Sequence, residues 1–208
     1  GASLGDVCFI GGAGLIGNLC AQLALIAGCR VVLSDLDEKK LELFESECLR
    51  PGDEVRCVNP DNALRAIEEM SDGKGADSVY LCMATDKSAP VDQAVDVVRH
   101  GGNIVVVGVC DIHIPRHLFF LKEASVTISR AAGPGRYDPS FERDGKEYPA
   151  QYARWSEKEN LKETLRLMSN ESLKVRPLIS DSYSIDDLNQ AYTPVIAGES
   201  PAGIIIKW

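Results

Sequence analysis

The chain has 208 residues, of which 45% are hydrophobic and 25% charged, a composition typical of a globular protein with a buried core. Its formal net charge is −9, and Lys and Arg are nowhere concentrated. We therefore exclude nucleic acid and anionic membrane surfaces as main partners. We find no signal-peptide pattern and no apolar run long enough to span a bilayer.

Seven cysteines occur along the chain, an odd number with no C-x-x-C pair. Several lie inside apolar stretches, where cysteine behaves as a small hydrophobic residue. This pattern predicts reduced thiols in the cytoplasm rather than a disulfide framework or a zinc site. The seven are Cys8, Cys20, Cys29, Cys48, Cys57, Cys82 and Cys110.

The first two predicted elements enclose a glycine-rich turn. An apolar run over residues 7–11 predicts a strand, and residues 15–27 predict a helix that ends at Gly28. Between the strand and the helix lies the sequence Gly12-Ala13-Gly14-Leu15-Ile16-Gly17. This order of strand, glycine triplet and helix is typical of a dinucleotide-binding turn.

Each glycine of the triplet has its own expected role. Gly12 permits a tight turn, Gly14 lets the backbone approach a pyrophosphate, and Gly17 allows close packing of helix against strand. The unpaired N–H groups of the helix N-terminus would face the phosphates. The alternative is a glycine turn that binds nothing.

The second predicted strand, residues 30–35, ends at Asp35, which lies 21 residues after Gly14. An acid at this distance is expected to accept hydrogen bonds from the adenosine ribose and to repel a 2′-phosphate. It therefore favours NAD(H) over NADP(H). The alternative role for Asp35 is a helix cap, but Asp37 is already placed to cap the next helix.

Alternation of helices and strands continues to residue 128 and predicts an α/β fold, a Rossmann doubly wound parallel sheet over residues 1–128. The helix from Asp37 ends before Pro51, and a further strand is expected at 124–128. The predicted elements between them are strand 55–58, helix 62–71, strand 78–83, helix 91–99 and strand 103–109.

In such sheets, ligands bind beyond the carboxyl ends of the strands. We therefore predict that Met83, Ala84 and Thr85 lie under the cofactor, and that Gly108 and Val109 flank the nicotinamide. Plain packing would explain Val109 equally well, but it explains the glycine less easily.

Residues 129–208 form a C-terminal segment of different character. We expect a long loop over 131–152, a helix over 157–168, and short strands and a helix at 178–179, 185–192 and 203–208. Within the loop, an arginine could clamp an anionic group and a tyrosine could relay a proton. Candidate substrate contacts are Arg136 and Tyr137, with Tyr148, Tyr152 and Arg154 nearby. The alternative is a structural loop that packs against another domain.

Asp111, His113 and His117 are close enough in sequence to suggest a metal site. Metal ligation needs fixed geometry and supporting hydrogen bonds, and nothing in the pattern supplies them. We predict that these side chains, and His100, are exposed and that the chain binds no metal.

Taken together, these residues resemble the cofactor-binding part of the medium-chain dehydrogenase/reductase superfamily, which includes the zinc-type alcohol dehydrogenases. The resemblance covers nearly the whole chain and implies cofactor contacts for Leu15, Ile16, Leu36 and Lys40. Lys40 corresponds to the family's ribose-contacting lysine, with a solvated helix lysine as the alternative. The matching segments are the glycine motif, Ser34-Asp35-Leu36-Asp37, and residues 101–109, 177–179, 185–191 and 203–207.

The sequence Gly133-Pro134-Gly135-Arg136-Tyr137-Asp138 resembles a narrower bacterial subgroup. In that subgroup the dehydrogenase half is followed by a half similar to glucose–fructose oxidoreductase.

The chain also departs from the family pattern. Family members begin with a catalytic domain that provides the zinc ligands and proton relay, whereas this sequence starts a few residues before its first strand, and no Cys or His matches those ligands. We expect a part of a larger enzyme, or a natural half that lost its partner domain, with residues 129–208 returning into that domain. Alone it should bind cofactor but turn over little or no substrate.

Two functions from different classes are consistent with this pattern. The first is the NAD(H)-binding part of an oxidoreductase that exchanges a hydride with a small alcohol, sugar or carbonyl substrate. The second is a non-catalytic dinucleotide-binding or assembly module. The resemblance also implies a homodimer, in which strand 124–128 extends the sheet across a two-fold axis and residues 112–120 take part.

Overall fold

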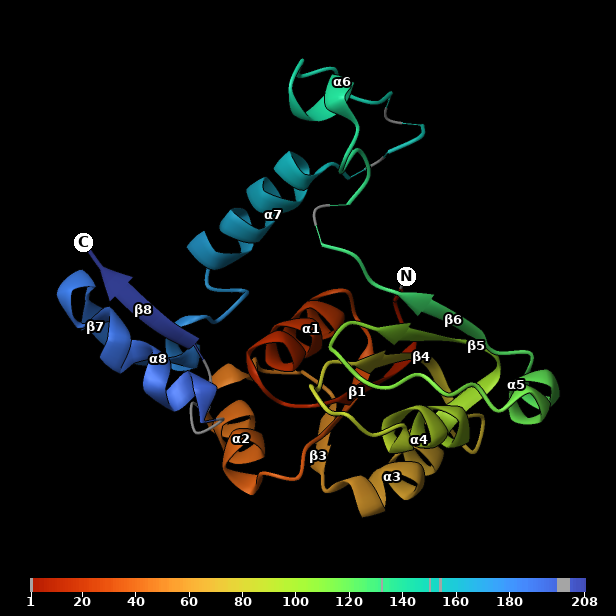
Figure 1. The fold of residues 1–208 in the computed structure, drawn as a ribbon. Coiled ribbons are helices and arrows are strands. Elements are labelled where there is room, and N and C mark those ends of the chain that lie inside the picture. The colour runs from red at the N-terminus through yellow and green to blue at the C-terminus, as the bar shows by residue number, and fades with distance from the viewer. Residues whose placement is uncertain (1, 132, 150, 154, 198–202) are drawn as a thin grey trace. The chain divides into compact units, whose positions relative to one another are not determined.

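A computed structural model describes residues 2–131, 133–149, 151–153, 155–197 and 203–208 (Figure 1). The chain divides into two compact units. The first comprises Gly1–Ile128 and Lys174–Trp208, and the second comprises Ser129–Leu173. Residues 174–208 thus group with the sheet rather than with the segment that precedes them.

The first unit contains a six-stranded sheet in the order β3-β2-β1-β4-β5-β6, with every neighbouring pair parallel. This confirms the predicted α/β doubly wound fold. The strands are β1 (Val7–Gly11), β2 (Arg30–Ser34), β3 (Val55–Val58), β4 (Ala76–Leu81), β5 (Val98–Val106) and β6 (Ser125–Ile128).

Helices cover both faces of this sheet (Figure 1). On one face pack α1 and α2, and on the other α3 and α4, with α5 beside β5. The helices are α1 (Leu15–Ile26), α2 (Glu38–Leu43, continued by a π-turn at Phe44–Cys48), α3 (Ala63–Met70), α4 (Ala89–Val97) and α5 (Arg116–Lys122). A short 3₁₀ turn, Pro60–Asn62, precedes α3.

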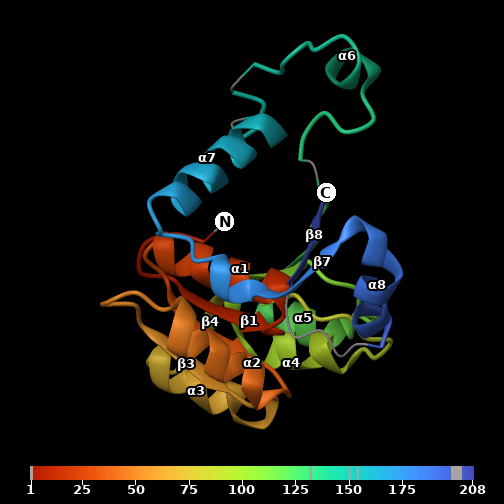
Figure 2. The same ribbon diagram turned by 90° about the vertical axis from the view of Figure 1, so that its left-hand side faces the viewer.

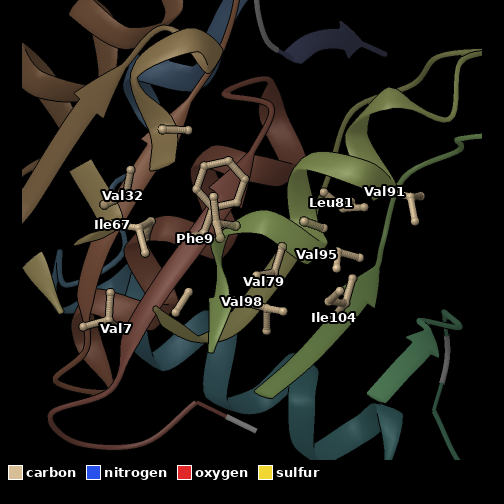
Figure 3. Close-up of a cluster of buried hydrophobic side chains, with 14 of the residues drawn as sticks. Val7, Phe9, Val32, Ile67, Val79, Leu81, Val91, Val95, Val98 and Ile104 are labelled. Atoms are coloured by element: carbon tan, nitrogen blue, oxygen red, sulfur yellow. The ribbon is translucent and has the colours of Figure 1, made fainter. Parts of the chain in front are cut away.

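The core explains why the central strands β1 and β2 are apolar along most of their length. Phe9 and Val32 pack towards α3 and α4 with Ile67 and Val95 (Figure 3), whereas Ile10 packs towards α1 and α2. Both faces of the central strands are therefore buried, as expected for a parallel sheet covered on both sides. Full burial of a side chain such as Phe9 contributes about 1.5–3 kcal/mol.

Several predicted boundaries around β4 and β5 are wrong. The predicted helix 91–99 ends at Val97, and Val98 already belongs to β5, where it pairs with Ala76. An irregularity in the register between Ala76 and Ser78 accommodates the extra residues. β4 and β5 end at Leu81 and Val106, two and three residues earlier than predicted.

The C-terminal residues of the first unit form a two-stranded parallel sheet, β7 (Ile179–Ser184) and β8 (Gly203–Lys207), with α8 (Leu188–Ile196) beside both strands (Figure 2). Two hydrogen bonds join the start of this segment to helix α1, which packs on the main sheet. The backbone N–H and C=O of Lys174 bond the side-chain amide of Gln22 on α1 at 2.7 and 3.0 Å. Leu178, in a 3₁₀ turn (Arg176–Leu178), is buried in the α1–α2 core.

The second unit contains α6 (Pro139–Glu142) and α7 (Glu157–Ser169). The predicted continuous loop 131–152 is therefore wrong at α6. Asp138 caps that helix by accepting from Ser140 N at 2.9 Å, and Pro139 occupies its first position. Ser156 and Glu159 form a capping box at the start of α7. Of the helices described in either unit, none combines the length and apolar character needed to cross a membrane.

Candidate nucleotide-binding cleft

Between β1 and α1, the turn has no room for side chains at two of its glycines. Gly12 has a φ of +93°, and an added Cβ would lie 3.0 Å from the backbone nitrogen of Met83. A Cβ on Gly17 would lie 1.6 Å from the carbonyl oxygen of Gly12. The turn itself therefore requires these two glycines, with or without a ligand.

Gly14 is different, because the space in front of it is open. Its φ is −66°, and an added Cβ would meet nothing within 4 Å. Gly14 is the N-cap residue of α1, and its carbonyl accepts the first helical hydrogen bond, from Asn18 N at 2.9 Å. The N–H groups of the first helical turn have no intrahelical partner, so this space suits an anionic group.

Asp35 follows β2 and links that strand to the glycine turn. Its Oδ2 accepts from the N–H of Ala13 at 2.6 Å, and its Oδ1 accepts from the N–H of Asp37 at 2.9 Å. A carboxylate has about four acceptor positions, so roughly two remain for other donors. Asp37 caps α2 through Lys39 N at 3.0 Å, which confirms the role predicted for it.

A cleft of about 400 Å³ opens at the carboxyl ends of β1, β2 and β4. This volume is within the usual range for small-molecule sites. Six residues predicted to contact a cofactor line it: Gly12, Asp35, Leu36, Met83, Ala84 and Thr85. The other predicted residues are not among those lining it: Gly14, Leu15, Ile16, Gly17, Lys40, Gly108 and Val109. Lys40 is half-buried on α2, and Leu15 and Ile16 are exposed at the start of α1.

Sequence reasoning missed seven further residues that line the cleft: Gly11, Ser34, Pro60, Lys87, Ala89, Pro90 and Gln93. Five of them lie beyond the ends of β3 and β4, and the rule that ligands bind at strand carboxyl ends, extended past the first residues, would have found them. Ser34 is the last residue of β2. Its side chain is 2% exposed, and its hydroxyl has no hydrogen-bond partner among the described residues.

Packing alone explains Gly108, contrary to the sequence-based expectation. A Cβ there would lie 2.1 Å from the carbonyl oxygen of Met83. That same oxygen accepts from the N–H of Val109 at 3.1 Å, and Val109 in turn forms a bridge with Ala84. The ends of β4 and β5 are thus joined too tightly for a side chain at Gly108. Val109 itself is 74% exposed, and its contact with a cofactor stays a prediction.

Beneath the glycine turn lie two neighbouring thiols, Cys82 after β4 and Cys20 on α1. Their mutual hydrogen bond, together with burial, raises the pKa of Cys82, and the same bond lowers the pKa of Cys20. Cys82 is therefore a neutral thiol at neutral pH and forms part of the floor under Gly17, whose added Cβ would lie 3.4 Å from the Cys82 Cβ. All seven cysteines are free thiols.

Nowhere in the described part of the chain do three or more His, Cys, Asp or Glu side chains come together to hold a metal ion. Asp111, His113 and His117 are exposed, as is His100. The described residues therefore do not fit a zinc site.

In the second unit, Arg136 has a partner inside its own loop. Its guanidinium lies 3.1 Å from a carboxylate oxygen of Glu142. Tyr137 has a φ of +71°, and the Cζ atoms of Arg130 and Arg136 lie 4.7 and 5.2 Å from its ring centroid. Arg154 lies outside the described residues.

Two tyrosines complete that loop. The Tyr148 hydroxyl donates to Asp138 at 2.5 Å, which raises the pKa of the tyrosine and lowers that of the acid. Tyr152 is 79% exposed. The residues of the loop are therefore held mainly by contacts with one another.

The parallel strand order, the glycine turn and the cleft at the strand ends define a Rossmann-type dinucleotide-binding fold. Residues 16–143 match the family described as zinc-binding dehydrogenase. The chain therefore belongs to the zinc-binding dehydrogenase family, a family of oxidoreductases, which confirms the resemblance found in the sequence.

Relatives with curated descriptions are dehydrogenases of alcohols and sugars. A sorbitol dehydrogenase from Halalkalibacterium halodurans is 24% identical over 199 residues, covering 94% of this chain and 50% of the relative. An NDMA-dependent alcohol dehydrogenase from Amycolatopsis methanolica is 25% identical, covering 99% of this chain and 50% of the relative. The chain thus spans about half the length of these relatives.

Among solved structures, benzyl alcohol dehydrogenase from Acinetobacter calcoaceticus has the same fold, with a TM-score of 0.74 at 21% identity, covering 99% of this chain and 50% of that chain.

Proposed function

We propose that this chain is the NAD(H)-binding part of an oxidoreductase that exchanges a hydride with a small alcohol, sugar or carbonyl substrate. The observation that supports this proposal most strongly is the cleft at the strand ends, where Asp35 joins the glycine turn on one wall. When bound, the nicotinamide supplies the hydride chemistry, and the protein supplies binding and orientation.

Each part of the cleft has a defined task in this proposal. The free acceptor positions of Asp35 take the hydroxyls of the adenosine ribose, and its negative charge disfavours a 2′-phosphate. The open space before Gly14 takes the diphosphate, near the N-terminus of α1. The buried hydroxyl of Ser34, which lacks a described partner, is a further group that a ligand or an ordered water would satisfy.

Proton transfer and any zinc site belong, in this proposal, to a part of the protein outside these 208 residues. Arg136 and Tyr137 contact the substrate once Glu142 is displaced from the arginine. A homodimer forms through the edge of β6, and Phe120 and Leu121, on the helix that precedes this strand in the chain, are 68% and 67% exposed. The free thiols agree with a reducing compartment, the cytoplasm.

Titration of the chain with NADH and NADPH, followed by fluorescence, tests the proposal. We expect NADH to bind more tightly, and Asp35→Asn to weaken NADH binding and reduce the preference over NADPH. Asp37→Asn is the matched control, because it removes the same charge two residues away, and asparagine still caps α2. Equal losses of NADH affinity in both variants would show a general charge effect and contradict ribose recognition by Asp35.

The rival function is a non-catalytic dinucleotide-binding module. It predicts binding without hydride transfer to an artificial acceptor in the full-length parent protein. Turnover in the parent would exclude it. Failure of the chain to bind either dinucleotide would contradict both functions.

A further inference from the structure

Most of the cleft wall is apolar, and only a few of its polar groups have no hydrogen-bond partner. Leu36, Pro60, Met83 and Pro90 provide flat or aliphatic surface. Three polar side chains of the cleft have no task towards the ribose or diphosphate: Thr85, Lys87 and Gln93. Of these, Gln93, on the second turn of α4, has an amide that is held by another part of the cleft wall.

The amide of Gln93 has a fixed orientation. Its Nε2 donates to the carbonyl oxygen of Pro60 at 2.8 Å. Because a carbonyl oxygen can only accept, the nitrogen must face Pro60 and the amide cannot be turned over. Gln93 Oε1 accepts no hydrogen bond from any residue within the described ranges. The cleft therefore contains an acceptor of fixed orientation, Gln93 Oε1, to which an N–H group of a ligand could donate.

Within a dinucleotide, the adenine base is the part that matches this wall. It is attached to the ribose assigned to Asp35, and Leu36, the next residue, is 80% exposed at the cleft. The base is flat, as the apolar wall requires, and its 6-amino group is an N–H donor. Hypoxanthine has a carbonyl oxygen in place of that amino group, so it would put an acceptor against Gln93 Oε1.

We infer that Gln93 recognises the 6-amino group of adenine and so determines which base the cleft accepts. This inference rests on the proposed function, because it requires that the cleft binds a nicotinamide dinucleotide. Pro60 acts here through Gln93, by holding the amide in place.

The experiment compares NADH with reduced nicotinamide hypoxanthine dinucleotide, titrated by fluorescence into the chain. One neutral hydrogen bond corresponds to roughly a 2- to 12-fold difference in dissociation constant in favour of NADH. In Gln93→Met the ratio should fall to about one, through weaker binding of NADH. Gln190→Met is the control, since Gln190 is an exposed glutamine on α8 that bonds Asp187 and does not line the cleft.

The two proposals fail in different ways. Equal affinities of the unaltered chain for the two dinucleotides would overturn the role of Gln93 and leave NAD(H) binding intact. The same holds if Gln93→Met weakens both ligands equally. If neither dinucleotide binds the unaltered chain, the proposed function fails, and this inference fails with it. The comparison on the unaltered chain needs no variant, so a folding defect in Gln93→Met does not decide the outcome.

Discussion

Alanine at Gly14 and at Gly17 should have different effects on stability, although the two positions lie in the same turn. At Gly14 the added methyl meets nothing within 4 Å, and alanine stabilises by about 0.4–1 kcal/mol through the unfolded chain. Because Gly14 is the N-cap of α1, where glycine is preferred to alanine, this gain is offset and the net change should stay within about 1 kcal/mol. At Gly17 the methyl would lie 1.6 Å from a backbone oxygen. The turn or the helix must then shift, which costs about 1–3 kcal/mol.

These free energies translate into separable melting temperatures. In a chain of this size, 1 kcal/mol corresponds to about 2–4 °C. Gly14→Ala should therefore melt within about 4 °C of the unaltered chain, whereas Gly17→Ala should melt roughly 2–12 °C below it. The NADH affinity of Gly14→Ala should not follow its melting temperature. The methyl at Gly14 fills the space proposed for the diphosphate, and loss of hydrogen bonds to a charged group weakens binding by about tenfold or more.

Differential scanning fluorimetry and NADH titration of the two variants provide the measurements. A Gly14→Ala variant that binds NADH as tightly as the unaltered chain would show that the diphosphate lies elsewhere. A Gly14→Ala variant that melts well below the unaltered chain would show that the space is not open. In Gly17→Ala, an unchanged melting temperature would contradict the close approach of helix and turn.

Three other predictions concern stability and assembly. Burial raises the pKa of Asp77, but hydrogen bonds from Val7 N (2.8 Å) and Arg99 Nε (2.6 Å) outweigh it and hold that pKa below its ordinary value. The stabilisation that the ionised Asp77 gives the folded chain is therefore complete above about pH 4 and is lost as the pH falls through the lowered pKa. Asp77→Asn should reduce the acid dependence of the urea midpoint, and an unchanged dependence would refute this. Ser34→Ala should keep or raise the urea midpoint, because the buried hydroxyl has no described partner, and a loss above about 1 kcal/mol would reveal one. Light scattering at high concentration should give the mass of a dimer, and Phe120→Ser that of a monomer; a monomer before substitution counts against the interface.

Local rules were enough to predict the sheet and the glycine turn. The central strands β1 and β2 are buried on both faces, so they appear in the sequence as apolar runs. Gly12 has a positive φ and Gly17 lies against the nearby carbonyl of Gly12, so local backbone geometry favours glycine at both positions. Asp35 directly follows its own strand, and only the close approach of Met83 to Gly12 depends on a distant part of the chain.

Other features depend on contacts between residues far apart in the sequence. Val98 extends β5 because it pairs with Ala76, and no local pattern distinguishes it from the end of a helix. Gln93 lies in the middle of a helix and belongs to the cleft only because Pro60, 33 residues earlier, holds its amide. The division of the chain near residue 128 and the fusion to a second half stay predictions.

Asp35 shows why a motif should be considered together with its hydrogen bonds. The sequence rule assigns the acid to the ribose alone, yet one of its oxygens already holds Ala13 in the glycine turn at 2.6 Å. The acid therefore shapes the turn before any ligand arrives, which lowers the ordering required on binding. Removing the whole carboxylate would disturb the turn and the sugar contact together. Asparagine loses the charge and keeps one acceptor oxygen, which can accept from Ala13 N or from Asp37 N but not from both. The melting temperature of Asp35→Asn, measured beside its NADH affinity, therefore separates a disturbed turn from a lost ribose contact.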